Sequence, residues 1–164
     1  MRTITSHEEQ SLEKIIKRRL SGEPLSYIIG TREFYSISLS VNHDVLIPRQ
    51  ETELLVETIL SFINENQLDN PRIVDVGTGS GAIAIALATN LPTAIIDAID
   101  ISEKALKVAK ANIDMHWLTN RISLHLGDLL ESIYEDDLDV IVSNPPYIPT
   151  GDISFLQEEV LLEP

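Results

Sequence analysis

Short apolar runs alternate with helix-like segments in the second half of the chain, and this rhythm limits the fold more than any other feature. The apolar runs, which favour strands, occupy residues 72–76, 94–99, 122–126 and 138–142. Two segments of helical length separate the first three, one from 81 to 90 and one that Ser102 caps and that runs to about residue 112. Strands that alternate with such helices form βαβ units with right-handed crossovers. The alternation therefore predicts an α/β fold with an open, doubly wound parallel sheet of about four strands.

Residues 1 to about 70 follow a different pattern and are expected to pack beside this sheet. Ser6 and Glu9 fit a capping box, with Ser6 as the N-cap. An apolar stripe at helical spacing follows, made of Leu12, Ile15, Ile16 and Leu20. Gly22 and Pro24 are expected to end this first helix.

A hairpin and a second helix are expected before the sheet. Apolar residues alternate over 34–41, which predicts a hairpin that turns near 42–44 and returns through 45–47. From Glu51 to about residue 64 the apolar residues return at helical spacing, with acidic residues in the first turn.

Composition and charge narrow the classes of function. The chain has 164 residues with 12 Lys+Arg and 26 Asp+Glu, a formal net charge of −14. This balance repels phosphate backbones and argues against duplex DNA as a partner. The absence of Cys excludes disulfides and thiolate metal sites, and the four His show no ligand spacing, so no metal is expected. No apolar run has membrane-spanning length and no secretory signal is visible, so we expect a cytoplasmic protein without a membrane partner.

A glycine-rich turn joins the first strand of the sheet to the helix after it. The turn consists of Gly77, Thr78, Gly79, Ser80 and Gly81. Its glycines permit a tight turn, let a ligand approach bare backbone, and leave N–H groups free for an anion at the helix start. Asp100 ends the next strand, where a carboxylate can accept hydrogen bonds from two ribose hydroxyls. The spacing is not that of the dinucleotide G-x-G-x-x-G, and a plain turn with a helix-capping acid remains the alternative.

The string from Val74 to Gly81 resembles the cofactor loop of class I S-adenosylmethionine methyltransferases, which have a Rossmann-like sheet. Asp75 lies just before the first glycine, facing the entry of the ligand. The resemblance implies that the loop holds the methionine end of S-adenosylmethionine and that Asp100 holds its ribose. It also implies that Asp128 bonds the adenine amino group and that Leu129 covers the ring. A turn residue is the alternative for Asp128.

An Asn-Pro-Pro-Tyr tetrad, Asn144, Pro145, Pro146 and Tyr147, follows the fourth strand. Two prolines fix φ twice and remove two N–H donors. The groups that remain are mostly acceptors, the Asn144 side-chain oxygen and the Pro145 carbonyl, and they suit a planar –NH2 group. Tyr147 supplies a flat face for stacking. The tetrad therefore predicts a catalytic and substrate-binding site, with Asn144 also beside the cofactor; the alternative is a rigid turn with a half-buried Tyr.

Within the segment before the sheet, residues 1 to about 70, three strings resemble one particular family. Residues 22–30 (GEPLSYIIG), 32–34 (REF) and 45–53 (VLIPRQETE) look like the release-factor glutamine methyltransferase family of the HemK or PrmC type. Gln50 stands where that family usually has proline. The resemblance implies methyl transfer from S-adenosylmethionine to the amide nitrogen of glutamine in the Gly-Gly-Gln motif of peptide-chain release factors, the implied partners.

Two alternative functions stay open. A DNA or RNA adenine-N6 methyltransferase shares the tetrad, but it would need a basic target-recognition segment, and none is visible. A non-catalytic fragment that binds S-adenosylmethionine is the other. Arg49 and Glu53 are expected to line the cofactor or substrate mouth, with a surface ion pair or a helix start as the alternative.

The family resemblance also implies a domain division. Residues 1–30 are expected to be the last helix of an N-terminal helical substrate-recognition domain, 31–70 a linker of hairpin and helix, and 71–164 a partial methyltransferase domain. Relative to the family, the chain is expected to be cut at both ends, with an open edge on the fourth strand. Such a fragment is expected to be marginally stable, oligomeric or inactive alone.

Overall fold

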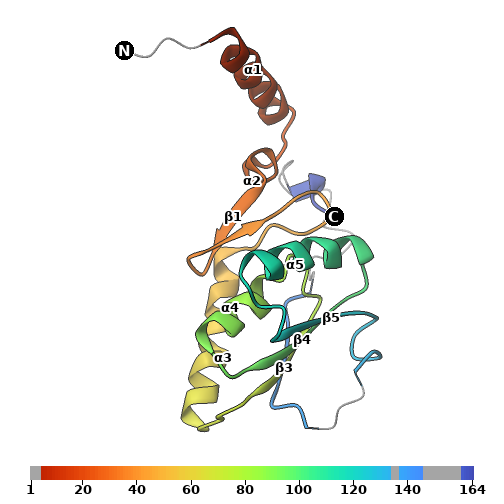
Figure 1. The fold of residues 1–164 in the computed structure, drawn as a ribbon. Coiled ribbons are helices and arrows are strands. Elements are labelled where there is room, and N and C mark those ends of the chain that lie inside the picture. Colours follow the sequence, from red (N-terminus) through yellow and green to blue (C-terminus); the bar gives the residue numbers. More distant parts are fainter. Residues whose placement is uncertain (1–4, 134–136, 146–159) are drawn as a thin grey trace.

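The structure is a computed structural model that describes residues 5–133, 137–145 and 160–164. A four-stranded parallel sheet forms its centre (Figure 1). The strands are β3 (Arg72–Val76), β4 (Ile95–Asp100), β5 (Ile122–Leu126) and β6 (Val140–Ser143). The predicted α/β fold is confirmed, and two of the four expected strands have the expected bounds.

The order of the strands across the sheet is β5-β4-β3-β6. The chain moves outward from β3 to β5 and then returns to the other side of β3, where Val76 pairs with Ser143. This reversal creates a topological switch point between β3 and β6, and ligands of open α/β sheets bind at the carboxyl ends of strands beside such a point. Gly77 and Asn144 are the first residues beyond these two strands.

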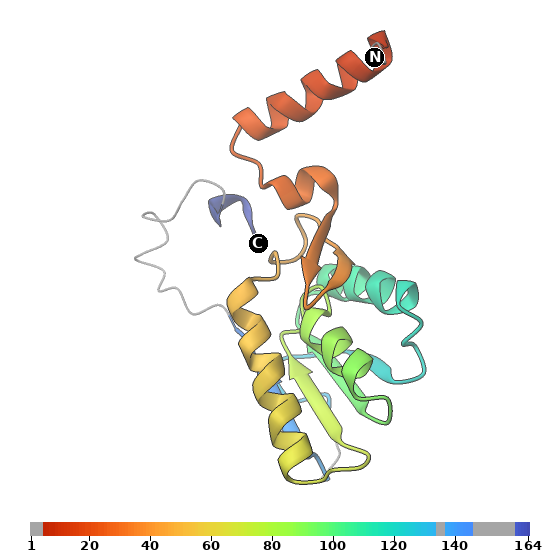
Figure 2. The ribbon, with the colours of Figure 1, turned by 90° about the vertical axis from the view of Figure 1, so that its left-hand side faces the viewer.

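Three helices cover one face of the sheet (Figure 2): α3 (Glu53–Glu65), α4 (Ala82–Asn90) and α5 (Glu103–Met115). Residues 82–88 of α4 are all buried, which explains why this helix consists almost entirely of Ala, Ile and Leu. On the other face, Val74, Val76 and Ile99 pack against Ile133 and Leu138 from the connection between β5 and β6. The chain therefore winds over both faces, as the alternation predicts.

The structure has a hairpin, as predicted, but it begins and turns earlier in the chain than the sequence indicates. Strands β1 (Thr31–Phe34) and β2 (Ile37–Ser40) meet at Tyr35 and Ser36, whose φ angles are 50° and 60°. Two left-handed residues make a tight turn that normally favours Asn-Gly, so the sequence carried no turn signal there. The chain does turn at 42–45, where the Val45 N–H donates to the Asn42 carbonyl at 3.2 Å, but this turn joins no strands. The expected return strand through 45–47 is wrong, since these residues lie outside any strand.

Two helices precede the hairpin, α1 (Ser6–Leu20) and α2 (Leu25–Ile29), and α1 extends away from the sheet (Figure 1). The capping box of α1 uses Thr5 and Glu8 and not Ser6 and Glu9, because Thr5 Oγ1 accepts from the Glu8 N–H and the Glu8 carboxylate accepts from the Thr5 N–H. The predicted apolar stripe of α1 is exposed.

Two 3-10 turns complete the described elements, η1 (Gln50–Thr52) and η3 (Val160–Leu162). Because η1 occupies the expected start of the second long helix, α3 begins at Glu53 and not at Glu51. No helix in the described part of the chain combines the length and apolarity needed to cross a membrane.

Candidate functional site

The predicted site residues gather where the four parallel strands end, an edge of the sheet called the carboxyl edge here. The glycine turn follows β3, Asp100 ends β4, and Asn144 follows β6. Asp100 pairs with Leu126 at the end of β5, so Asp128 emerges close to it. Pro146 and Tyr147, for which substrate contacts are predicted, lie outside the described residues.

The glycine turn presents bare backbone at this edge. Gly77 and Gly79 have φ angles of 75° and 56°, and a Cβ added to either would meet no atom within 4 Å. Gly81 has a different role, because its φ is 82° and a Cβ there would lie 3.2 Å from Ile85 and 3.5 Å from Ala109. The first two glycines therefore leave open space for a ligand, and the third lets α4 approach α5.

Several N–H groups of the glycine turn are already bonded within the chain. The N–H groups of Gly77 and Thr78 both donate to the Ile99 carbonyl at 2.9 Å, and that of Gly79 donates to Asp100 Oδ2 at 2.8 Å. The end of β4 therefore lies against the turn, and its carbonyl and carboxylate oxygens accept hydrogen bonds from these N–H groups. These bonds hold the turn against the end of β4.

Asp100 fixes two neighbouring segments at once. Its Oδ2 accepts from Gly79 and its Oδ1 accepts from the Ser102 N–H at 2.9 Å. Ser102 in turn caps α5 as predicted, because its hydroxyl accepts from the Ala105 N–H. Each carboxylate oxygen can accept more than one hydrogen bond, so the predicted contact with ribose hydroxyls stays a prediction.

Asp75 is a buried carboxylate with one oxygen unsatisfied. Its Oδ2 accepts from Thr78 Oγ1 at 2.7 Å and from the Ala84 N–H at 3.3 Å. Its Oδ1 has no hydrogen-bond partner among the described residues. Burial raises the pKa of Asp75 to about 6, against the lowering effect of the bonds from Thr78 and Ala84, and the charge of Asp100 raises it further. An unpaired buried carboxylate oxygen beside bare backbone suits a cationic ligand group.

Asn112 is a structural contributor that sequence reasoning missed. It is fully buried, its Oδ1 accepts from the Ser40 N–H at 2.7 Å, and its Nδ2 donates to the carbonyls of Ser40 and Ser80 at 3.0 and 2.8 Å. Ser80 is itself 2% exposed. Asn112 therefore ties the hairpin to the glycine turn. The signal in the sequence was a polar residue on the apolar face of α5, between Ala109 and Ile113.

Asn144 lies at the switch point beside the glycine turn. The hydroxyl of Ser143 donates to the Val76 carbonyl at 2.9 Å, which holds the end of β6 against the end of β3. Asn144 Nδ2 donates to Thr52 Oγ1 at 2.9 Å. Within the described part of the chain Asn144 Oδ1 makes no hydrogen bond, and both Asn144 and Pro145 are exposed. The amide nitrogen is therefore engaged within the chain, while the amide oxygen has no donor among these residues.

Arg49 and Glu53 bind other parts of the chain. Arg49 Nη2 forms an ion pair with Glu163 Oε1 at 2.5 Å, and the Glu163 side chain is buried, whereas the alternative in the sequence was a pair on the surface. The predicted place of Arg49 at the cofactor or substrate mouth stays a prediction. Glu163 Oε2 also accepts from the Ile47 N–H at 3.0 Å. Glu53, the first residue of α3, accepts from the N–H of Tyr35 in the hairpin turn at 2.9 Å.

Asp128 and Leu129 are both exposed beyond β5, with Leu129 in a left-handed conformation at φ 48°. Their predicted adenine contacts stay predictions. Among the residues that the structure describes, no three His, Asp or Glu side chains gather in a way that could hold a metal ion.

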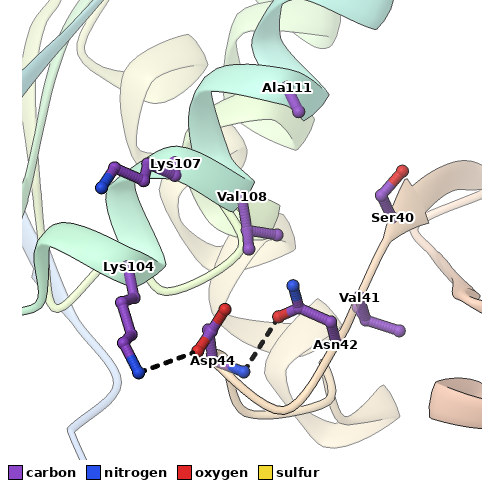
Figure 3. Close-up of a pocket in the computed structure, with 8 residues that line it drawn as sticks. All are labelled: Ser40, Val41, Asn42, Asp44, Lys104, Lys107, Val108 and Ala111. Atoms are coloured by element: carbon purple, nitrogen blue, oxygen red, sulfur yellow. Dashed lines mark hydrogen bonds and ion pairs between the residues drawn. The ribbon is translucent and has the colours of Figure 1, made fainter.

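A separate pocket of about 260 Å³ lies between the end of the hairpin and α5, and no predicted site residue lines it (Figure 3). Three of its lining residues contact each other: Lys104 Nζ lies 3.7 Å from Asp44 Oδ1, and the Asp44 N–H donates to Asn42 Oδ1 at 2.9 Å (Figure 3). We therefore assign the carboxyl edge, and not this pocket, as the candidate site.

Comparison with protein families gives two matches. The model of the methyltransferase small domain matches residues 50–161, and that of the PrmC N-terminal domain matches residues 1–30. Among curated proteins, the release factor glutamine methyltransferase of Coxiella burnetii is 46% identical and that of Chlorobaculum tepidum 43% identical. The alignments cover 91% and 97% of this chain but 53% and 56% of the two relatives. The chain thus spans about half the length of the curated relatives it matches.

Solved structures share the fold at lower identity. The N-terminal domain of human METTL16 aligns with a TM-score of 0.58 and 21% identity over 84% of this chain and 58% of that one. A structure of the METTL16 MTase domain gives a TM-score of 0.59 and 23% identity over 75% and 51% of the two chains. These likenesses support the sheet topology described above.

Proposed function

Because the chain belongs to the methyltransferase small domain family, for which S-adenosylmethionine is the cofactor, we propose that it transfers a methyl group to the side-chain amide nitrogen of a glutamine. We propose as acceptor the glutamine of the Gly-Gly-Gln motif in peptide-chain release factors. The names of the relatives and the match to the PrmC N-terminal domain support this choice. The observation that carries it is the position of Asn144 directly after β6 and beside the end of β3, with no donor to its amide oxygen among the described residues.

The residues at the carboxyl edge suit the cofactor. The bare backbone at Gly77 and Gly79 would receive its methionine end, and the unpaired oxygen of Asp75 would face a cationic group. The carboxylate of Asp100 would accept from the ribose hydroxyls, and Asp128 and Leu129 would contact the adenine. Thr78 and Ser80 would act by keeping the turn in shape, since both are buried.

The acceptor needs positioning more than activation by a base. The lone pair of an amide nitrogen is delocalised into its carbonyl, and the two hydrogens on that nitrogen are donors. Asn144 Oδ1 and the Pro145 carbonyl would each accept one of them and aim the nitrogen at the methyl group. Orientation of this kind can lower a barrier by several kcal/mol, up to about 7–11 kcal/mol in the best cases. Pro146 and Tyr147 would close the site by packing and stacking on the acceptor amide.

Atoms and charge balance in the proposed reaction without a side chain of the protein that acts as a base. The bound cofactor supplies a methyl group on a positively charged sulfur. In the proposed transfer the glutamine nitrogen would gain this methyl group, the cofactor would leave as a neutral thioether, and the nitrogen would lose one proton. Because Asn144 and Pro145 are exposed, that proton can pass to solvent.

The proposed partner agrees with the charge of the chain. A net charge of −14 opposes binding to duplex DNA, which disfavours an adenine-N6 methyltransferase that acts on duplexes. A release factor as acceptor would place the protein in the cytoplasm, where translation takes place.

Transfer of a labelled methyl group tests the proposal directly. The full chain is incubated with S-adenosylmethionine that carries a tritiated methyl group, and with a release factor, its Gln→Ala variant at the Gly-Gly-Gln motif, or duplex DNA. Label on the unaltered release factor alone supports the proposal. Label on DNA supports the adenine-N6 alternative, and cofactor binding without label on any acceptor supports a non-catalytic role.

A further inference from the structure

Asn144 receives its hydrogen-bond partner from a distant part of the chain. Its Nδ2 donates to Thr52 Oγ1 at 2.9 Å, although the two residues lie 92 positions apart. We propose that Thr52 is a positioning residue for methyl transfer. Its hydroxyl accepts from Asn144 Nδ2 and leaves the amide oxygen of Asn144 turned toward the glutamine that receives the methyl group. This inference rests on the proposed function and names a residue that sets the geometry of its site.

The proposed reaction requires one orientation of the Asn144 amide. The oxygen and nitrogen of an Asn side chain have nearly the same shape, and a half-turn of the amide exchanges them. The nitrogen of a glutamine amide offers only hydrogens to its surroundings. A reversed Asn144 would therefore place its own –NH2 against the –NH2 of the acceptor, and the hydrogen bond would be lost. Pro145 restricts the backbone of Asn144 but leaves its amide free to turn.

Thr52 holds the Asn144 amide in the orientation that the structure shows. It occupies the N-cap position of α3, where a Thr hydroxyl normally accepts from the backbone of its own helix. Here Thr52 makes no such capping bond, and its hydroxyl oxygen accepts from Asn144 instead. The backbone of Thr52 is held by η1, since its N–H donates to the Arg49 carbonyl at 3.1 Å. The hydroxyl is therefore available to Asn144, because its own helix does not use it.

Variants at Thr52 separate the hydroxyl from the shape of the side chain. Thr52→Val removes the hydroxyl and keeps the volume, while Thr52→Ser keeps the hydroxyl. Thr58→Val is the matched control, because Thr58 also lies on α3 and its exposed hydroxyl donates to the Leu54 carbonyl. We expect Thr52→Val to lower kcat for a release factor about 10- to 100-fold, because Asn144 would then align the glutamine nitrogen less well with the methyl group. Thr52→Ser and Thr58→Val should retain kcat, and affinity for S-adenosylmethionine should stay near that of the unaltered chain in all three.

Two further measurements show whether Thr52 acts through Asn144. The side-chain amide signals of Asn144 in a ¹⁵N NMR spectrum should shift in Thr52→Val and stay in place in Thr58→Val. In an Asn144→Ala background, Thr52→Val should cause no further loss of kcat. Unchanged kcat together with unchanged Asn144 signals in Thr52→Val would overturn the inference. If the unaltered chain transfers no methyl group to a release factor, the proposed function fails, and the NMR comparison still decides whether Thr52 orients Asn144.

Discussion

Asp75 shows how one side chain can serve both the fold and the site. It is 1% exposed, and one of its oxygens holds Thr78 and the first turn of α4 in place. The other oxygen has no partner among the described residues, and burial raises the pKa of the group to about 6. Near neutral pH the unbound protein therefore keeps a buried negative charge with incomplete hydrogen bonding, which favours binding of a cation.

The raised pKa of Asp75 predicts how the free energy of unfolding depends on pH. The folded pKa of about 6 exceeds the ordinary value of 3.8, so the folded state holds the Asp75 proton more tightly than the unfolded state does. The stabilisation from this proton is fully present below about pH 4 and is lost as pH rises through 6. Relative to Asp75→Asn, the unaltered chain should lose up to about 3 kcal/mol of unfolding free energy across that window.

Urea unfolding of both proteins at several pH values between 4 and 7 measures this difference. Asp69→Asn, at an exposed carboxylate, is the matched control. Affinity for S-adenosylmethionine should show the opposite trend, with tighter binding above pH 6 in the unaltered chain and little pH dependence in Asp75→Asn. A stability difference that does not vary with pH would contradict this account of Asp75.

At the scale of elements, the site depends on how the hairpin and α5 hold the glycine turn. Asn112 of α5 bonds both backbone groups of Ser40 in β2 and the carbonyl of Ser80 in the turn. These three bonds join segments that are far apart in sequence. The shape of the turn is therefore set partly from outside the strand and helix that flank it.

Removal of the Asn112 side chain tests this link. Asn112→Ala leaves buried polar groups of Ser40 and Ser80 without partners, and we expect a loss of about 2–4 kcal/mol in unfolding free energy. Affinity for S-adenosylmethionine should also fall, because the turn loses its anchor. Asn90→Ala is the control, since Asn90 is exposed and its amide donates within α4 to the Ala86 carbonyl. Equal small losses in the two variants would show that Asn112 does not anchor the turn.

The elements that the sequence predicts well are those with a local signal. The alternation of β-branched runs with helices identified all four strands, and β3 and β5 have the expected bounds. The hairpin turn was misplaced because Tyr35 and Ser36 adopt left-handed angles without a glycine or asparagine to signal them. The contact between Thr52 and Asn144 has no local signal at all, because it joins residues 92 positions apart. The roles of Pro146, Tyr147, Asp128 and Leu129 stay predictions.

At the scale of the whole molecule, the segment from residue 45 to 53 connects parts that the sheet alone does not join. Glu53 binds the hairpin turn, Thr52 binds Asn144, and Arg49 binds Glu163. The side chain of Glu163 is 3% exposed, while that of Arg49 is 44% exposed. One of the three segments that resemble the PrmC type therefore also links the hairpin to the switch point and to η3.

A double-mutant cycle tests whether this link stabilises the molecule. Arg49→Ala and Glu163→Ala should show a coupling energy of about 1–2 kcal/mol, because Glu163 is buried and its charge needs a partner. The exposed pair of Lys107 and Glu103, at 3.1 Å, is the control and should give a coupling below about 0.5 kcal/mol. Equal couplings in the two cycles would mean that the Arg49 pair is a surface contact without structural weight.

The central claim is that the amide oxygen of Asn144 accepts a hydrogen bond from the side-chain nitrogen of the substrate glutamine at the switch point of the sheet. Methyl transfer to a release factor and affinity for S-adenosylmethionine, both measured in Asn144→Ala, test it most directly. We predict that transfer falls by about 100-fold or more while cofactor affinity changes by less than about 10-fold, because the loss falls on positioning of the acceptor. Transfer at the rate of the unaltered chain would contradict the claim.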